Sequence, residues 1–446
     1  MAEKIRGKYW NEELETLPHK ELEKRQLADL KEIVQFAYDH APYYKRSFDE
    51  AGVKPSDIHE LKDIEKFPFI NKKTQRDTQG VGSFLGELAA VPEEDVIFVS
   101  TSSGSTGVPT MSPFTKKDFD EFQDCESRWF WQIGMRPKDR YVHALNFSLY
   151  VGGPDVIGAQ NLGALCIWGG TLPSERLLFI LKTYKPTVIW TSPSYAWQLG
   201  EKALKSGIDP KKDLNIQKII VAGELGGSIS STRKAIEELW GAEVYDFYGL
   251  SDIFGACAAM CEAKDGLHIA EDHILVETVD IHTGEVLKPG EVGELVFTTL
   301  RKHARPLIRF RTGDIGWIDN TPCKCGRTHG RIHINGRKDD MFIVSAVNVF
   351  PSDIEAVIHE LKDITGEYLI RIFEKDFTCK YKVEIEKTAG NPKTDAEIAA
   401  EVSNALKARI GVKPAEVVVH PDGGLNTRSE HKSKRIIDER KLEYHI

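Results

Sequence analysis

Between residues 141 and 247 the chain alternates short apolar runs with segments of helical periodicity. The apolar runs predict strands at Tyr141–Leu145, Ala164–Trp168, Thr187–Thr191, Lys218–Ala222 and Glu243–Phe247. Helical patterns lie between them, at Ser174–Tyr184, with Ser174 as the expected N-cap, and at Ser231–Trp240. This alternation predicts α/β layers around a largely parallel sheet.

The pattern changes on both sides of this region. Near the start, Leu27, Leu30, Val34, Ala37 and Tyr38 follow a helical rhythm that Pro42 is expected to end. From Leu275 short strands and turns such as Gly293–Phe297 predict a β-rich subdomain, about 275–335. After Gly336 the pattern predicts a small α+β domain. It consists of two alternating strands (Tyr368–Phe373, Lys380–Glu386), a helix with Ile398, Val402, Leu406 and Ile410 on one face, and a further strand (Glu416–Val419). We therefore expect an N-terminal domain over residues 1–335 and a C-terminal domain over 336–446.

Composition narrows the class of protein. The 446 residues are 41% hydrophobic and 28% charged, which is typical of a globular chain of two or more domains. A net charge of -9 disfavours nucleic acid as a partner, and no apolar run is long enough to predict a membrane span. The start shows no secretory signal, and the seven cysteines are an odd number, so we expect a cytoplasmic protein whose clustered cysteines hold metal.

The stretch Ser100–Thr110 is the first candidate for chemistry. Apart from Val108 and Pro109 it consists of Ser, Thr and Gly, and it follows the apolar run Val96–Val99. Glycines let a backbone approach closely, and successive N–H groups with hydroxyls can surround a polyphosphate. A flexible Ser/Gly linker has a similar composition and stays an alternative. No Gly-Lys-Ser/Thr occurs, so this is not a Walker loop.

The loop resembles the phosphate loop of the AMP-forming acyl-adenylate synthetases, in particular the phenylacetate–CoA ligase family. The resemblance implies that ATP is bound here, by Ser102, Ser103, Gly104, Ser105, Thr106 and Gly107. It also implies a large N-terminal domain and a small, mobile C-terminal domain.

The segment Asp246–Asp252 ends a predicted strand, where open α/β sheets place their ligands. A tyrosine face can stack on adenine, and a carboxylate can hold Mg²⁺ against phosphates, although an ordinary strand-to-turn junction is the simpler interpretation. The segment resembles the family's Y-G-L-S-E motif, with Asp252 in place of glutamate. The resemblance implies ATP contacts from Asp246, Tyr248, Gly249 and Ser251 and a magnesium ligand in Asp252.

Further motifs resemble the family's nucleotide site. Arg311–Asp314 is similar to its R-T-G-D turn, which implies that Asp314 holds the ribose hydroxyls. Gly223 and Glu224 resemble its adenine wall, and Arg337 is implied to reach the ribose or phosphates. A capped turn is the alternative for the Thr-Gly-Asp motif, and a plain turn is the alternative for Gly223 and Glu224.

The C-terminal motifs imply a moving domain. Gly336–Pro351 resembles the linker about which the family's small domain rotates, with Asp339 as the hinge and Ala346 where the family has glycine on the pantetheine path. Arg428–Lys434 resembles its R-S-E-G-K loop, which implies Lys432 as the adenylation lysine, with His431 in place of glycine. A solvated basic tail is the alternative for the last segment.

Two cysteines one residue apart, Cys323 and Cys325, make half of a metal site, and Cys261 and His268 can complete a tetrahedron. The set resembles the zinc site found in part of the family and would be structural. Cys257, His329 and His333 are rival ligands.

The resemblance implies ATP-dependent, AMP-forming activation of a carboxylic acid, aryl or arylacetic, followed by transfer to coenzyme A. Phe147, Tyr150 and Tyr195, with Trp190, are the candidate acid pocket, although aromatic residues at strand ends are often core. An ionised carboxylate needs no general base, so alignment and charge neutralisation carry the reaction. The expected partners are ATP, CoA and the acid, with a homodimer left open. Two alternatives remain, namely a non-CoA acceptor, as in relatives resembling coenzyme F390 synthetase, and a non-catalytic nucleotide- and zinc-binding protein.

Overall fold

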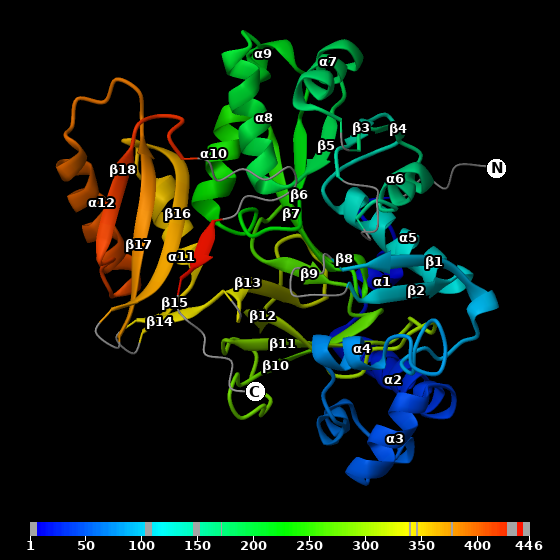
Figure 1. The fold of residues 1–446 in the computed structure, drawn as a ribbon. Helices are drawn as coiled ribbons and strands as arrows, with labels where there is room; N and C mark the ends of the chain where they lie inside the picture. The colour runs from blue at the N-terminus through cyan, green and yellow to red at the C-terminus, as the bar shows by residue number, and fades with distance from the viewer. Residues whose placement is uncertain are drawn as a thin grey trace.

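The computed structural model describes residues 7–102, 109–145, 152–170, 172–338, 340–344, 347–375, 378–425 and 435–439. Figure 1 shows a large body built on one long sheet, with a smaller body of helices and strands beside it. The smaller body is the C-terminal part, coloured from yellow to red. No helix in the described ranges is long and apolar enough to cross a membrane.

Helices form the N-terminal part of the large body. Leu30, Val34 and Ala37 are buried on one face of α2 (His19–His40), as their spacing predicts. Pro42 not only follows the end of α2 but is the first residue of α3 (Pro42–Ala51), because its fixed φ suits a helix N-terminus. The other elements are α1 (Glu12–Glu15), α4 (Lys72–Thr78), and the 3-10 turns η1 (Pro55–Asp57), η2 (Leu61–Lys66) and η3 (Glu93–Asp95).

Parallel strands form one half of the long sheet, in the order β4-β3-β5-β6-β7. All five predicted strands are present, and the predicted α/β fold class is confirmed. The strands are β3 (Arg140–His143), β4 (Leu165–Trp168), β5 (Val188–Thr191), β6 (Lys218–Val221) and β7 (Glu243–Leu250). The helices are α5 (Lys116–Gln132), α6 (Val156–Leu162), α7 (Ser174–Tyr184), α8 (Pro193–Lys205), α9 (Pro210–Asp213) and α10 (Ser230–Trp240).

The prediction that Ser174 caps α7 is wrong. Ser174 is the first helical residue, and the extended Pro173 holds the cap position. The Ser174 hydroxyl is instead hydrogen-bonded to the Tyr195 hydroxyl at 3.1 Å, which ties α7 to α8.

The other half of the sheet continues from β7 with antiparallel neighbours, in the order β8-β9-β13-β12-β11-β10. The predicted β-rich segment therefore shares one sheet with the parallel strands. A separate hairpin of β1 (Val96–Thr101) and β2 (Met111–Thr115) carries the Ser/Gly loop. The antiparallel strands are β8 (Phe254–Met260), β9 (Leu267–Ile269), β10 (Ile274–Val279), β11 (Gly293–Thr299), β12 (Phe310–Asp319) and β13 (Arg331–Arg337).

The C-terminal body has a sheet in the order β18-β17-β16-β19 and its own hydrophobic core, which includes Val357, Tyr368 and Leu406. Its helix α11 lies beside α10 of the large body (Figure 1). The elements are β14 (Phe342–Val344), β15 (Val347–Val349), α11 (Pro351–Glu360), β16 (Ile364–Lys375), β17 (Thr378–Lys387), α12 (Asp395–Ile410), β18 (Glu416–His420) and β19 (Ile436–Asp438).

Candidate nucleotide-binding active site

A tyrosine, an aspartate and an arginine from three strands meet at the end of β7. The Tyr248 hydroxyl donates a hydrogen bond to Asp314 Oδ2 at 2.6 Å, and Arg337 Nη1 donates to Asp314 Oδ1 at 2.8 Å. Burial raises the pKa of the Asp314 carboxyl, against the opposing effect of Arg337 and Tyr248. Each carboxylate oxygen keeps a second lone pair, so Asp314 can also accept from a pair of ribose hydroxyls.

Two glycines allow the backbone to form this cluster. Gly313 has a φ of +78°, and a Cβ there would lie 2.9 Å from Arg337 Nη2. A Cβ on Gly249 would lie 1.8 Å from the carbonyl oxygen of Gly255, where β7 and β8 approach. Any larger residue at either position would push apart the elements that carry Tyr248 and Asp314.

Asp246 lies beneath Gly227 and Ser228, in the connection between β6 and α10 that also contains Gly223 and Glu224. It is buried, and it accepts a hydrogen bond from the Ser228 hydroxyl. A Cβ on Gly227 would lie 2.5 Å from Asp246 Cγ, so the turn rests directly on this carboxyl. Burial raises the pKa of Asp246 to about 7, with Ser228 and Arg233 acting in the opposite direction. Asp246 is thus placed to support the turn.

The Ser/Gly loop connects β1 to β2 close to Ser251, at the end of β7. Its described ends are joined by hydrogen bonds from Ser102 N to Thr110 O at 3.0 Å and from Thr110 N to Ser102 Oγ at 3.1 Å. Ser100 Oγ donates to the carbonyl oxygen of Ser251 at 3.1 Å, which holds β1 against the end of β7. Ser103, Gly104, Ser105, Thr106 and Gly107 lie outside the described residues.

Asp252 is surrounded by cations. Lys72 Nζ donates to both carboxylate oxygens at 2.6 Å, and Arg305 Nη2 lies 3.7 Å from Oδ1. Burial acts to raise the pKa of Asp252, but Lys72 and Arg305 outweigh it and lower the pKa. The Lys72 ammonium and the Arg305 guanidinium already neutralise the charge of this carboxylate, and a dication ligated by Asp252 would lie among like charges, so the residues present do not fit a magnesium ion there.

A second buried lysine fixes the backbone around Asp252. Lys302 Nζ donates to Ser112 Oγ and to the carbonyl oxygens of Asp252 and Ile253, at 3.1 and 2.6 Å for the two carbonyls. It also lies 3.9 Å from the centre of the Phe114 ring, a cation–π distance. These contacts join the turn after β7 to β2.

Sequence reasoning missed Lys72, Lys302 and Arg305. Lys302 and Arg305 lie in a stretch where apolar residues alternate with several basic ones, which could have indicated buried cations. Lys72 carries no such signal, because the adjacent Lys73 looks the same in sequence and yet is exposed and paired with Asp77.

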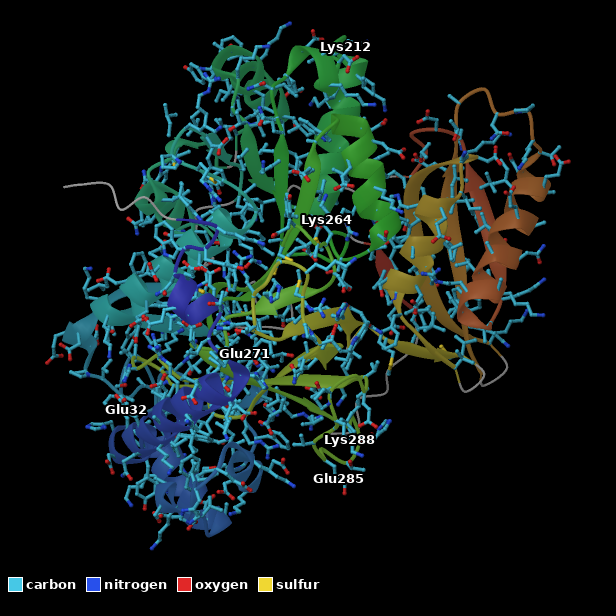
Figure 2. All side chains as sticks on the ribbon, turned by 180° about the vertical axis from the view of Figure 1, so that it is seen from behind. Glu32, Lys212, Lys264, Glu271, Glu285 and Lys288 are labelled. Carbon is cyan, nitrogen blue, oxygen red and sulfur yellow. The ribbon has the colours of Figure 1, made fainter. Side chains whose placement is uncertain are left out.

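The structure brings Cys261, His268, Cys323 and Cys325 together, with their ligand atoms within 4.8 Å of one another. Cys261 Sγ lies 3.7 Å from Cys323 Sγ, and Cys325 Sγ lies 3.2 Å from His268 Nε2. His268 Nδ1 lies 2.9 Å from the His329 carbonyl oxygen, so the Nδ1–H tautomer leaves Nε2 to face the sulfurs. Lys264, labelled in Figure 2, marks the loop that follows Cys261.

The rival ligands are engaged elsewhere. His329 has both ring nitrogens 3.0 Å from backbone carbonyl oxygens. His333 stacks on Trp317 with ring centres 4.5 Å apart, and Cys257 is part of the large hydrophobic core.

The remaining candidates divide into two groups. Trp190 is buried against Phe130 and Phe247, as a core residue is, and half-buried Tyr195 bonds to Ser174. Phe147, Tyr150, Asp339 and Lys432 lie outside the described residues.

Comparison with known proteins shows the family to which the chain is related. The AMP-binding enzyme family matches residues 16–300, and the AMP-binding enzyme C-terminal domain matches residues 346–440. The phenylacetate-coenzyme A ligase of Thermus thermophilus is 36% identical over 431 residues, which cover 96% of this chain and 92% of that protein.

Solved structures of 2-hydroxyisobutyryl-CoA ligase agree with this result. In the postadenylation state with R3-HIB-AMP, that enzyme matches with a TM-score of 0.92 at 29% identity, over 98% of this chain and 94% of its own. In the thioesterification state with 2-HIB-AMP and CoA, the TM-score is 0.74 at 30% identity, over 99% and 94%. The chain belongs to the AMP-binding enzymes and, among them, to the phenylacetate–CoA ligase family.

Proposed function

We propose that the protein activates a carboxylic acid with ATP, releases pyrophosphate, and transfers the acyl group from its adenylate to coenzyme A. The observation that carries this proposal is the meeting of Tyr248, Asp314 and Arg337 at the end of β7 in a chain that is related to CoA ligases over almost its whole length. Asp314 and Arg337 would hold the ribose, and Tyr248 would face the adenine beside the Gly223–Glu224 turn.

The proposed reaction needs no general base. A carboxylic acid is ionised at neutral pH, so the enzyme must align it with the α-phosphorus and neutralise the charge that develops there. We assign this charge neutralisation to Lys432 and the Ser/Gly loop. Magnesium would come as the counter-ion of ATP and is assigned no residue.

The acid is proposed to be aryl or arylacetic, because the Thermus thermophilus relative is a phenylacetate-coenzyme A ligase. The structural likeness to 2-hydroxyisobutyryl-CoA ligase adds small branched hydroxy acids to the panel that must be tested. Pyrophosphate release should be measured with each acid, with and without CoA. Release that depends on an acid, with thioester formed only when CoA is present, is expected. Release without CoA consumption would favour another acceptor, and no release with any acid would refute the proposal.

We also propose a structural zinc ion held by Cys261, His268, Cys323 and Cys325. Two thiolates on a zinc tetrahedron lie about 3.8 Å apart for Zn–S bonds of about 2.3 Å, and the Cys261–Cys323 separation is 3.7 Å. Such a closed site would join the end of β8 to the turn between β12 and β13. Thiolate ligands must stay reduced, which supports a cytoplasmic location.

Rotation of the C-terminal body is proposed to separate the two half-reactions, with the boundary near residue 336 and the hinge at Asp339. One support is that a single relative matches this arrangement closely in its postadenylation state and less closely in its thioesterification state. The present arrangement would therefore correspond to the postadenylation state.

A second copy of the chain is the proposed partner for the sheet edge at β4, which ends the strand order. Leu165 and Trp168 on this strand are 56% and 52% exposed. Light scattering on the purified protein and on Trp168→Glu would test this dimer, which the variant should dissociate.

A further inference from the structure

The carboxylate that the family resemblance assigns to a metal already has a cation. Lys72 Nζ lies 2.6 Å from both oxygens of Asp252, and Asp252 is only 3% exposed. A magnesium ion at this carboxylate would lie beside an ammonium and a guanidinium that already neutralise it. The residues present therefore favour a lysine, and not a metal, as the permanent partner of Asp252.

The surroundings carry an excess of positive charge. Two cations, Lys72 and Arg305, face the single carboxylate of Asp252. Lys302 lies in the same cluster, where burial lowers its pKa well below the ordinary value. Among the described residues, Arg305 Nε and Nη2 have no hydrogen-bond partner, although Arg305 is 3% exposed and its Nη1 donates to Met111 O. Nη2 lies 3.7 Å from Asp252 Oδ1, and buried donors of this kind are completed by water or by a further anion.

The position of Lys72 indicates which anion. Its Nζ also donates to Thr110 Oγ1 at 3.1 Å, and Thr110 Oγ1 lies 3.0 Å from Ser102 Oγ at the base of the Ser/Gly loop. The ammonium thus bridges Asp252 and the base of the loop that would bind phosphates. The Lys72 side chain is 32% exposed, so an anion beside Thr110 and Ser102 can reach it.

We propose that Lys72, supported by Arg305, supplies the protein's cation for the β- and γ-phosphates of ATP and for the pyrophosphate that leaves. Any magnesium is carried by the nucleotide and does not bind Asp252, which instead positions Lys72. This inference rests on the proposed function, because it names the phosphate partner within the same site.

Pyrophosphate binding without metal tests the role of Lys72. Inorganic pyrophosphate is titrated into the intact protein in the presence of a chelator, and binding is followed by calorimetry. Lys72→Met should weaken binding by about tenfold to a hundredfold, the range for losing a hydrogen bond to a charged group. Lys73→Met is the matched control, because Lys73 is the next residue of the same helix and pairs with Asp77, and it should bind like the wild type. Equal affinity of Lys72→Met and wild type would overturn the proposal.

A double variant separates this role from a structural one. Lys72→Met alone leaves Asp252 buried without its ammonium, which can disturb the fold. Lys72→Met/Asp252→Asn removes both charges and should fold, but it should bind pyrophosphate as weakly as the single variant. Return of wild-type affinity in the double variant would show that Lys72 only neutralises Asp252.

A further experiment, with Mn²⁺ in place of Mg²⁺, tests whether Asp252 ligates the metal that accompanies ATP. Wild type and Asp252→Asn are compared by electron paramagnetic resonance in complex with Mn²⁺ and a non-hydrolysable ATP analogue. At saturating analogue and Mn²⁺ the same spectrum is expected for both proteins, and a changed Mn²⁺ spectrum in the variant would identify Asp252 as a metal ligand. None of these measurements requires turnover. A failure of acid-dependent pyrophosphate release would refute the proposed function, whereas the binding measurements test the role of Lys72 independently of it.

Discussion

Replacing Asp246 by asparagine should remove a pH-dependent part of the protein's stability. Asp246 is 6% exposed and lies beneath the Gly227–Ser228 backbone. Burial raises its pKa from the ordinary value of 3.8 to about 7. Native protein therefore holds this proton more tightly than unfolded protein does.

The sign and size of the pH-dependent change in the free energy of unfolding follow from proton linkage. Because the pKa is raised on folding, the stabilising contribution is complete below the unfolded value near 3.8 and is lost as the pH rises through about 7. A shift of about three pKa units, at about 1.4 kcal/mol per unit, corresponds to roughly 4 kcal/mol across this window. Asparagine keeps the size and the hydrogen-bonding capacity but does not ionise, so the variant should lack this loss.

Urea unfolding followed by tryptophan fluorescence between pH 4 and 8 would measure the effect. The free energy of unfolding of wild type should fall with rising pH relative to Asp246→Asn, and exposed Asp77→Asn should follow the wild type. A constant difference between wild type and Asp246→Asn at all pH values would refute the reasoning.

The other predictions concern the metal site and residues assigned through the family. Cys323→Ser should release about one zinc per chain, seen by elemental analysis, and lower the Tm by on the order of 5–10 °C; protein purified without chelator that contains no zinc would contradict the site. Lys432→Ala should slow adenylate formation by on the order of 10²–10³ yet spare thioester formation from supplied acyl-adenylate, with Lys434→Ala as the control that should change neither. Asp339→Pro should keep pyrophosphate exchange and lose thioester formation, because proline fixes φ near −65°; thioester made at the wild-type rate would exclude a hinge there.

Local patterns predicted the parallel half of the sheet because each strand is a short apolar run. The predicted run Lys218–Ala222 and the strand β6 differ by one residue, and α7 has its predicted bounds. The antiparallel half was harder, because its pairing is set by contacts between distant segments. Leu267 of β9 pairs with Ile332 of β13, and nothing in either segment indicates the other.

In the site, too, local motifs predicted single residues, whereas contacts between distant segments could not be predicted. Tyr248, Asp314 and Arg337 were each predicted from a short motif, and their mutual hydrogen bonds required the fold. Lys72 could not be predicted, since its role depends on Asp252, which is 180 residues further along the chain.

The contact between the two bodies is suited to an interface that must open. It includes hydrogen bonds from Ser231 Oγ to the Ala356 carbonyl oxygen at 3.1 Å and from Thr232 Oγ1 to Glu355 Oε1 at 3.2 Å, while Tyr368 holds the other oxygen of Glu355 from within the C-terminal body. Ser352 Oγ also donates to the Asn335 carbonyl oxygen, and the rings of Trp197 and His359 lie 6.2 Å apart across the contact. Each such hydrogen bond contributes about 0.5–1.5 kcal/mol net, because water replaces it when the surfaces part. The hydrophobic core of the C-terminal body is a cluster of its own, so rotation would not expose it. Hydroxyls and a carboxylate can therefore hold one orientation of the small body and release it at low cost, as the proposed rotation about Asp339 requires.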